Sequence, residues 1–224
     1  FAGGESTAAT ARSVDFDRSG DYLSLASSSD FAFGTGDFTI ECWAKAKDSN
    51  DFAGVFNLST TSGGFGNMYE MSLEHASGVW RMTYGDNGSN FGTNVSSSSK
   101  ASIGVWTHLA YVRSSGVTKL YVNGIEEISV TDTTDYQRTN LAIGGMYSTD
   151  YLWEGEISNF RVVKGTAVYT SSFRPPTEPL TNITNTKLLC CNNSSTTGST
   201  VTPGTITANG DPTASTDSPF DDPA

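Results

Sequence analysis

Apolar and polar side chains alternate along several stretches of the chain with a period of two residues. Segment 38–44 reads FTIECWA, so Phe, Ile, Cys and Ala fall on one side of an extended backbone. Glu41 and Trp43 fall on the other side. A period of two is that of a β-strand with one buried face. We therefore predict a strand over residues 38–44 with its apolar side toward a core.

The clearest local signal is a β-hairpin between residues 118 and 130. Segments 118–122 and 125–130 are rich in strand-forming residues, and Asn123 and Gly124 alone separate them. Asn and Gly tolerate the positive φ that a type I′ turn requires at both central positions. The sequence therefore predicts two antiparallel strands joined by a two-residue turn.

The same features predict many further short strands, and strong helix formers are scarce throughout. Clusters of Gly, Ser, Asn and Asp separate the strands, as turns require. Many short strands of this kind favour an all-β fold, an antiparallel two-sheet β-sandwich. The additional predicted strands are 13–16, 22–25, 52–58, 69–73, 79–84, 106–113, 141–144, 156–163 and 187–190.

The composition changes after residue 168. We predict an N-terminal arm (1–12), a sandwich domain (13–168) and a strap and tail rich in Pro, Ser and Thr (169–224). Three prolines in segment 173–179 exclude a central strand, because each removes a backbone donor. We expect this segment to be an extended strap across the sandwich. The tail from Asn192 needs its own domain, or neighbouring subunits, to hold it in place.

Several segments resemble the laminin-G-like, concanavalin A-like jelly-roll family. Segments 36–43, 106–113, 120–124 and 155–162 look like its core strands, and 14–23 looks like its first hairpin. The resemblance implies a jelly-roll sandwich over roughly 13–168. It implies little about activity, since this fold serves lectins, glycanases and scaffolds alike.

A narrower resemblance concerns the strap. Segments 160–170, 173–176 and 187–190 are similar to laminin-G-like modules in structural proteins of tailed, particularly marine, bacteriophages. This implies a non-enzymatic protein of the virion surface, in a head decoration, fibre or appendage. Its partners would be other virion subunits, with homo-oligomers and host-surface glycans also expected. Two alternatives are a secreted or cell-surface lectin module and a self-assembling extracellular filament subunit.

Charge and cysteine content narrow the compartment and the partners. With 13 Lys and Arg against 24 Asp and Glu, the net charge of −11 argues against nucleic acid and anionic membranes as partners. No apolar run approaches the roughly 20 residues of a spanning helix. Cys42, Cys190 and Cys191 cannot all pair, and unpaired thiols suit phage assembly in a reducing cytoplasm. Two adjacent cysteines on a strand would point to opposite faces, one to the core and one outward. Whether Cys42 forms a disulfide with Cys190 or with Cys191 stays open.

Paired catalytic carboxylates are missing from the sequence. Glycanases of the resembled family carry E-x-D-x-E or E-x-D-x-x-E on one strand, and neither string occurs here. Glu154 and Glu156 are the nearest pair, without a third acid. The only histidines are His75 and His108, and we interpret His108 as a locally bonded strand residue. We therefore expect no enzyme.

The resemblance also implies a calcium ion at the rim of the sandwich. Asp17 and Asp21 flank a tight turn, and Asn159 on the closing strand is the third candidate ligand, because first and last strands are neighbours in this fold. Segments 48–51 and 86–90 are alternatives. Each of these is equally explained by Asp and Asn capping their own turns.

Sugar binding requires aromatic faces beside amide or carboxylate groups. Three loops combine these features: Phe65 with Asn67 in the first, and the eight candidate residues of the other two. The alternative is that Phe91 and Trp153 simply cover the ends of the sandwich. The candidate glycan-binding residues are Asp86, Asn87, Asn90 and Phe91 in the second loop, and Tyr147, Asp150, Tyr151 and Trp153 in the third.

Overall fold

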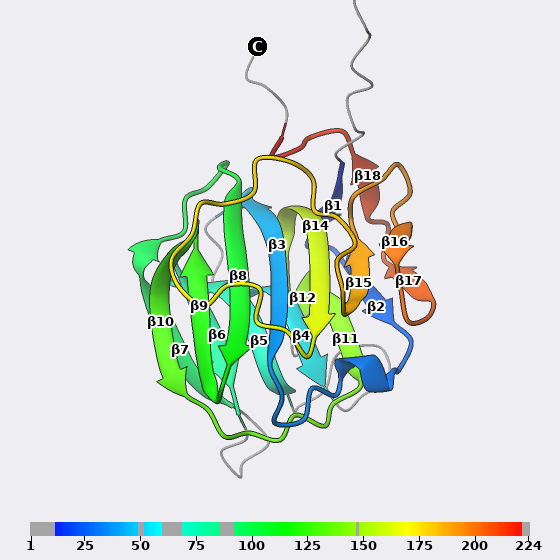
Figure 1. Cartoon of the computed structure of the whole chain (residues 1–224). Coiled ribbons are helices and arrows are strands. Elements are labelled where there is room, and N and C mark those ends of the chain that lie inside the picture. The colour runs from blue at the N-terminus through cyan, green and yellow to red at the C-terminus, as the bar shows by residue number, and fades with distance from the viewer. Residues whose placement is uncertain (1–11, 49–51, 60–68, 86–91, 147, 221–224) are drawn as a thin grey trace, which may run out of the picture.

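The computed structural model describes residues 12–48, 52–59, 69–85, 92–146 and 148–220. These residues form two antiparallel sheets packed face to face, with one turn of 3₁₀ helix at Ser29–Phe31 (Figure 1). The prediction of an all-β, two-sheet sandwich is confirmed. Among the described residues, no helix has the length and apolar character that crossing a bilayer demands.

The first sheet, called sheet A, has nine strands. Seven of them follow the order β10-β9-β8-β3-β14-β1-β18, while β15 pairs with β14 and β16 pairs with β15. The strands are β1 (Ser13–Asp17), β3 (Phe38–Ala46), β8 (Thr107–Ser114), β9 (Val117–Val122), β10 (Ile125–Thr131), β14 (Glu154–Lys164), β15 (Thr186–Cys190), β16 (Ser199–Val201) and β18 (Thr213–Ser215).

The second sheet, sheet B, has seven strands in the order β17-β2-β11-β4-β5-β6-β7, and a separate two-stranded ladder joins β12 to β13. The strands are β2 (Tyr22–Leu25), β4 (Ala53–Ser59), β5 (Tyr69–Ala76), β6 (Val79–Tyr84), β7 (Thr93–Lys100), β11 (Asn140–Ile143), β12 (Gly145–Met146), β13 (Ser148–Leu152) and β17 (Ile206–Asn209).

The apolar core lies between the two sheets, where the alternation placed it. Phe38, Ile40, Cys42 and Ala44 are all buried in this one cluster, as predicted. The predicted hairpin is also present as β9 and β10. Its turn has φ of 49° at Asn123 and 77° at the following glycine, the positive values that a type I′ turn needs.

The strap, residues 165–185, crosses the outer face of sheet A over β3, β8 and β9 (Figure 1, yellow). Backbone bonds fasten it at both sides of this face. Phe173 N–H donates to the Gly124 carbonyl at 2.9 Å, and Gly165 N–H donates to the Asp37 carbonyl at 2.7 Å. Glu41, which alternation placed on the outer side of its strand, is consequently only 1% exposed.

The residues after the strap belong to the same sandwich. The sequence predicts one strand in this region, at 187–190, whereas the structure contains β15 and three more. β17 pairs with β2 in sheet B, and β18 pairs with β1 in sheet A. The tail is therefore held by its own domain through residue 220. The predicted arm, 1–12, lies outside the described residues except for Arg12.

All three cysteines are free and buried. The prediction that one of Cys190 and Cys191 points outward is wrong, because both are at most 1% exposed and their Sγ atoms lie 3.8 Å apart. The physical reason is the backbone of Cys191, whose φ of 56° ends the strand alternation. A left-handed residue turns its side chain back toward the core side.

Candidate functional site

A polar cluster lies beneath the strap on the outer face of sheet A. Glu41 on β3 accepts hydrogen bonds from Arg161 Nη2 at 2.6 Å and Nε at 3.0 Å. The hydroxyl of Tyr169, on the strap, donates to it at 2.8 Å, and His108 Nε2 lies 3.2 Å away. Strand register brings these groups together, since Glu41 pairs with Arg161 across the β3–β14 ladder.

This cluster fixes the charge of Glu41. Burial alone raises the pKa of a carboxyl group, but the hydrogen bond from His108 and the positive charge of Arg161 outweigh burial and hold the pKa of Glu41 below its ordinary value. Both Glu41 and His108 are buried. The cluster therefore attaches the strap to the sheet and is closed to a ligand.

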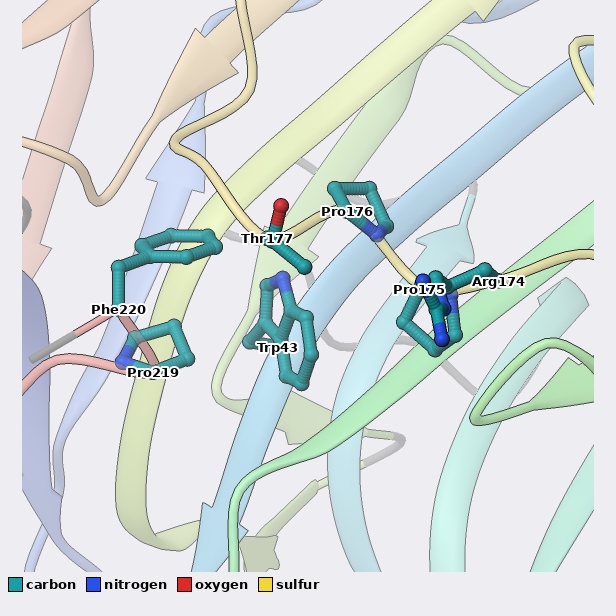
Figure 2. Close-up of a pocket in the computed structure, with 7 residues that line it drawn as sticks. All are labelled: Trp43, Arg174, Pro175, Pro176, Thr177, Pro219 and Phe220. Atoms are coloured by element: carbon teal, nitrogen blue, oxygen red, sulfur yellow. The ribbon is translucent and has the colours of Figure 1, made fainter. Parts of the chain in front are cut away.

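Beside this cluster, around Trp43, the outer face of sheet A forms a pocket of about 520 Å³. Trp43 stands at its centre, with Pro219 and Phe220 on one side and Arg174 and Pro175 on the other (Figure 2). The pocket is largely open to solvent, so a ligand would lie on its surface and would not be enclosed. The lining residues are Trp43, Arg174, Pro175, Pro176, Thr177, Pro219 and Phe220.

The C-terminal segment, residues 216–220, forms the second wall of this pocket. The Asp217 carboxylate pairs with Lys45 and accepts the indole N–H of Trp106 at 3.1 Å. The Asp217 carbonyl accepts the hydroxyl of Ser13 at 2.7 Å. This segment brings the Phe220 ring edge-on to Trp43, with a centroid separation of 5.7 Å. Three separate stretches of sequence thus meet at Trp43.

The chemistry of the pocket combines apolar surfaces with one cation. Trp43, Phe220 and the prolines present rings, while the guanidinium of Arg174 is exposed. A flat ring with an apolar face and polar edges fits such a surface. Our sequence analysis placed Trp43 on the outer face of its strand but did not select it as a candidate. An outward Trp in a strand was the signal that could have identified it.

A cluster of carboxylates lies at the rim of the sandwich. One oxygen from each of Asp17, Asp21 and Asp211 lies within 4.8 Å of the others. Asp21 accepts the backbone N–H of Asp17 at 3.0 Å and that of Asp211 at 2.7 Å. Burial, with a smaller contribution from the two neighbouring acids, raises the pKa of Asp21 despite these bonds.

Asn159, the third predicted ligand, does not approach this cluster. β1 and β14 are neighbours, as expected, but their antiparallel register sets Asp17 opposite Glu154, several residues from Asn159. The Asn159 side chain is buried, where it donates to Ser158 and accepts the N–H of Leu180. Asp211, from the segment between β17 and β18, takes the place expected of Asn159.

The predicted glycan loops are only partly described. Phe65, Asn67, Asp86, Asn87, Asn90, Phe91 and Tyr147 lie outside the described residues, as does the side chain of Asp150. Two residues remain to be placed. Tyr151 is half-buried and meets Phe52 edge-on at 5.7 Å. Trp153 is fully buried in the apolar core and stacks on Trp80.

The two acids nearest to a catalytic pair have structural partners. Burial and a hydrogen bond with Asp48 raise the pKa of Glu154. Glu156 is buried and lies 3.4 Å from the ammonium of Lys47, which also bonds Asp15. Burial raises the pKa of Glu156 as well. Both glutamates thus belong to a group of acids that surrounds the ammonium of Lys47.

Comparison with known proteins identifies relatives of the fold. A family described as the concanavalin A-like lectin/glucanases superfamily matches residues 17–168. No curated protein matches the chain by sequence. The following structural likenesses, all at low identity, support the fold alone.

A putative carbohydrate-binding protein from Bacteroides ovatus is 16% identical, with a TM-score of 0.62 over 91% of this chain and 59% of that one. Domain 4 of a GH43 extracellular arabinanase from Geobacillus stearothermophilus, in complex with arabinotriose, is 18% identical (TM-score 0.53, 70% and 72% covered). A heptameric SAP-like pentraxin from Limulus polyphemus is also 18% identical (TM-score 0.53, 71% and 78% covered).

Proposed function

Since the chain belongs to the concanavalin A-like lectin/glucanase superfamily, we propose that it is a non-enzymatic carbohydrate-binding module whose sugar site is the Trp43 pocket. The observation that carries this proposal is the pocket itself. Its aromatic and proline rings offer the apolar surface on which the C–H face of a sugar ring rests, and Arg174 offers hydrogen-bond donors. Two fold neighbours, the Bacteroides protein and the arabinanase domain, have names that refer to carbohydrate.

A glycan array tests this proposal. We expect the wild-type chain to bind at least one oligosaccharide and Trp43→Ala to lose that binding. Phe52→Ala is the matched control, because Phe52 is 37% exposed and lies outside the pocket, beside the predicted loop residue Tyr151. Binding that survives Trp43→Ala but fails in Phe52→Ala would move the site to the loops. An array on which nothing binds would contradict the proposal.

The absence of catalysis is the second part of the proposal. Glu154 and Glu156 are engaged with Asp48 and Lys47, and the sequence lacks the three-acid string of the resembled glycanases. We expect no turnover of laminarin- or agar-type polysaccharides. Turnover that Glu154→Gln or Glu156→Gln abolishes would overturn this part and leave the binding proposal in place.

Calcium binding is a finer part of the proposal. The cluster of Asp17, Asp21 and Asp211 presents hard oxygen ligands, which Ca²⁺ prefers. The fit has a physical basis, because two exposed acids, Asp17 and Asp211, flank the buried carboxyl of Asp21, whose pKa is raised. A cation there would offset their repulsion. We expect millimolar CaCl₂, but not NaCl of equal ionic strength, to raise the melting temperature. The rise should vanish in Asp211→Asn; an unchanged response in that variant would exclude this site.

The setting that we propose is the surface of a tailed-phage virion, beside other virion subunits and further copies of the same chain. Support comes from segments 160–170, 173–176 and 187–190, which resemble phage modules, and from the three free thiols, which suit assembly in a reducing cytoplasm. Mass spectrometry and immunogold labelling of purified particles test this setting. Labelled particles would support it, whereas free chain in the culture medium alone would favour a secreted lectin.

A further inference from the structure

We propose that the Trp43 pocket selects sugars that carry a negative charge and that Arg174 is the residue that selects them. This inference rests on the proposed sugar-binding function and adds the class of sugar. It follows from the distribution of charge around the pocket, from the support of Arg174 by its neighbours, and from the ring surfaces that surround it.

The pocket is an exception to the acidic character of the chain. Asp and Glu outnumber Lys and Arg by 24 to 13, yet among the residues that the structure describes no acidic side chain lines the pocket, and one arginine does. Two acids lie close by. Asp217 is already paired with Lys45, and Glu178, next to Thr177, is exposed and outside the lining. An anionic ligand therefore meets a locally favourable site on an otherwise repulsive molecule.

Arg174 has its charge free for a ligand. No ion pair or hydrogen bond joins its side chain to any other described residue, and the side chain is exposed. Most other cations of the described chain are engaged. The ion pairs are Lys45–Asp217, Lys47–Asp15, Arg81–Glu74, Lys119–Glu126, Arg161–Glu41 and Lys187–Asp30.

The backbone around Arg174 is held from both sides. The ring of Phe173, immediately before it, stacks on the Tyr169 ring with a centroid separation of 3.6 Å and meets the His108 ring edge-on at a centroid separation of 5.7 Å. The backbone N–H of Phe173 donates to the Gly124 carbonyl in the hairpin turn. Pro175 and Pro176, immediately after it, have fixed φ. A guanidinium carried by such a restrained backbone loses less conformational entropy on binding than one on a free loop.

The geometry suits an acidic sugar better than a simple anion. A guanidinium can bind a carboxylate through two parallel hydrogen bonds. Beside it, the rings of Trp43 and Phe220 offer surfaces for the C–H face of a pyranose (Figure 2). A uronic acid has both features within one residue, a carboxylate and an apolar ring face. An inorganic anion has only the charge.

The test compares acidic oligosaccharides with their carboxyl-reduced forms, which keep the ring stereochemistry and lose the charge. The probes are oligogalacturonate, oligomannuronate and a hyaluronan tetrasaccharide, titrated calorimetrically into the full chain. We expect one acidic form to bind about 10- to 100-fold more tightly than its reduced form, as a charge-assisted hydrogen bond allows. Raising NaCl should weaken only the acidic form.

Variants assign the effect to Arg174. Arg174→Gln should abolish the preference for the charged form, and Arg174→Lys should keep part of it. Lys100→Gln is the matched control, because Lys100 is an exposed cation on β7 of sheet B, outside the pocket. Asp221 and Asp222 follow Phe220 in the sequence but lie outside the described residues. Their double Asn variant should bind the acidic form at least as tightly as the wild-type chain does.

The outcomes separate this inference from the proposed function. Equal binding of acidic and reduced sugars, or a preference that persists in Arg174→Gln, overturns the inference while leaving sugar binding intact. A preference that Lys100→Gln also removes would reflect total charge and would overturn it too. Absence of all sugar binding, reduced forms and glycan array included, contradicts the proposed function itself.

Discussion

The two faces of strand β3 are both buried, but by different means. On the inner face, Ile40 and Cys42 pack among apolar side chains from sheet B. On the outer face, Thr39 and Glu41 are at most 1% exposed, and the strap covers them. A strand buried on both faces usually reads as a continuous apolar run. Strand β3 alternates instead, because the strap that covers its outer face provides hydrogen-bond partners for Thr39 and Glu41.

The two covers differ in what holds them in place. The inner face gains from the transfer of apolar surface out of water, worth about 25 cal/mol per Å² and insensitive to pH. The outer face depends on specific partners for a buried carboxylate, whose desolvation must be matched bond by bond. Removing one partner of Glu41 should therefore lower the free energy of unfolding as much as a cavity on the inner face does. Only the loss on the outer face should depend on pH.

The largest expected effect comes from Arg161→Met, which leaves Glu41 charged at pH 7 and without the two hydrogen bonds and the positive charge of the arginine. We expect the free energy of unfolding at pH 7 to fall by about 3–5 kcal/mol, measured by urea denaturation. In the adjacent inner-face variant Phe160→Ala, the free energy of unfolding should fall by a similar amount, about 3–5 kcal/mol, because the substitution leaves a cavity. A loss below 1 kcal/mol in Arg161→Met would contradict the role of the ion cluster in holding the strap, by the usual scale for exposed pairs.

The next effect separates the strap from the sheet beneath it. A Cβ on Gly124 would lie 1.9 Å from the Phe173 carbonyl oxygen, and its φ is +77°. Gly124→Ala should therefore push the strap away and cost about 2–4 kcal/mol by denaturation. Gly78→Ala isolates the backbone cost, since Gly78 has the same φ and open space around its Cβ. Equal losses in the two variants would show that the strap yields without resistance.

The inner face was predictable because it obeys local rules. Alternation over residues 38–44 identified its buried side chains, and Asn123–Gly124 identified the hairpin turn. Both signals reside in a few consecutive residues. Glu41 does lie on the outer face of its strand, as predicted. The sequence of β3 does not indicate, however, that this face is covered by the strap, which follows more than one hundred residues later in the chain.

The candidate site could not be predicted from local sequence patterns for the same reason. The pocket joins β3, the strap and the C-terminal segment, so its lining depends on tertiary packing of three distant stretches. Asp211 likewise joins Asp17 and Asp21 only through the pairing of β17 with β2 and of β18 with β1. Sequence rules favoured loops that carry aromatic and polar residues together, and Trp153 in one such loop proved to be core.

A third prediction uses pH to distinguish the two covers. In the wild-type chain, the lowered pKa of Glu41 adds stability above its unfolded value of 4.5, and this stability is lost as pH falls through the folded pKa. Arg161→Met removes the lowering contribution of the arginine, so we expect the pKa of Glu41 to be higher in this variant than in the wild-type chain, which favours the protonated form. The loss in Arg161→Met should thus be smaller at pH 4 than at pH 7, by at most about 1.4 kcal/mol for each unit by which the substitution raises the pKa of Glu41.

Phe160→Ala is the control for this titration. Its loss should stay constant between the two pH values, because cavity formation involves no proton. Both variants are measured against the wild-type chain at each pH, so that other titrating acids cancel. A loss in Arg161→Met that stays constant, or grows toward pH 4, would mean that Glu41 is not the charged group that the arginine compensates.

The smallest expected effect concerns the C-terminal wall of the pocket. Asp217→Asn removes the charge that pairs with Lys45, at a site where these side chains are 36% and 23% exposed. A half-exposed pair contributes about 0.2–1 kcal/mol, so the change in unfolding free energy should be close to the limit of measurement. Asp30→Asn, which breaks the similarly exposed pair with Lys187, should give the same small loss.

Under the proposed function the outer cover forms the sugar site, so the two variants should differ in sugar binding. Asp217 also accepts the indole N–H of Trp106 and positions the segment that carries Phe220 against Trp43. Asp217→Asn should therefore weaken binding of any sugar that Trp43→Ala abolishes, while Asp30→Asn should leave its affinity unchanged. Equal affinities in the two variants would mean that the C-terminal segment covers the sheet without shaping the pocket, and the sugar surface would then reduce to Trp43 and the strap.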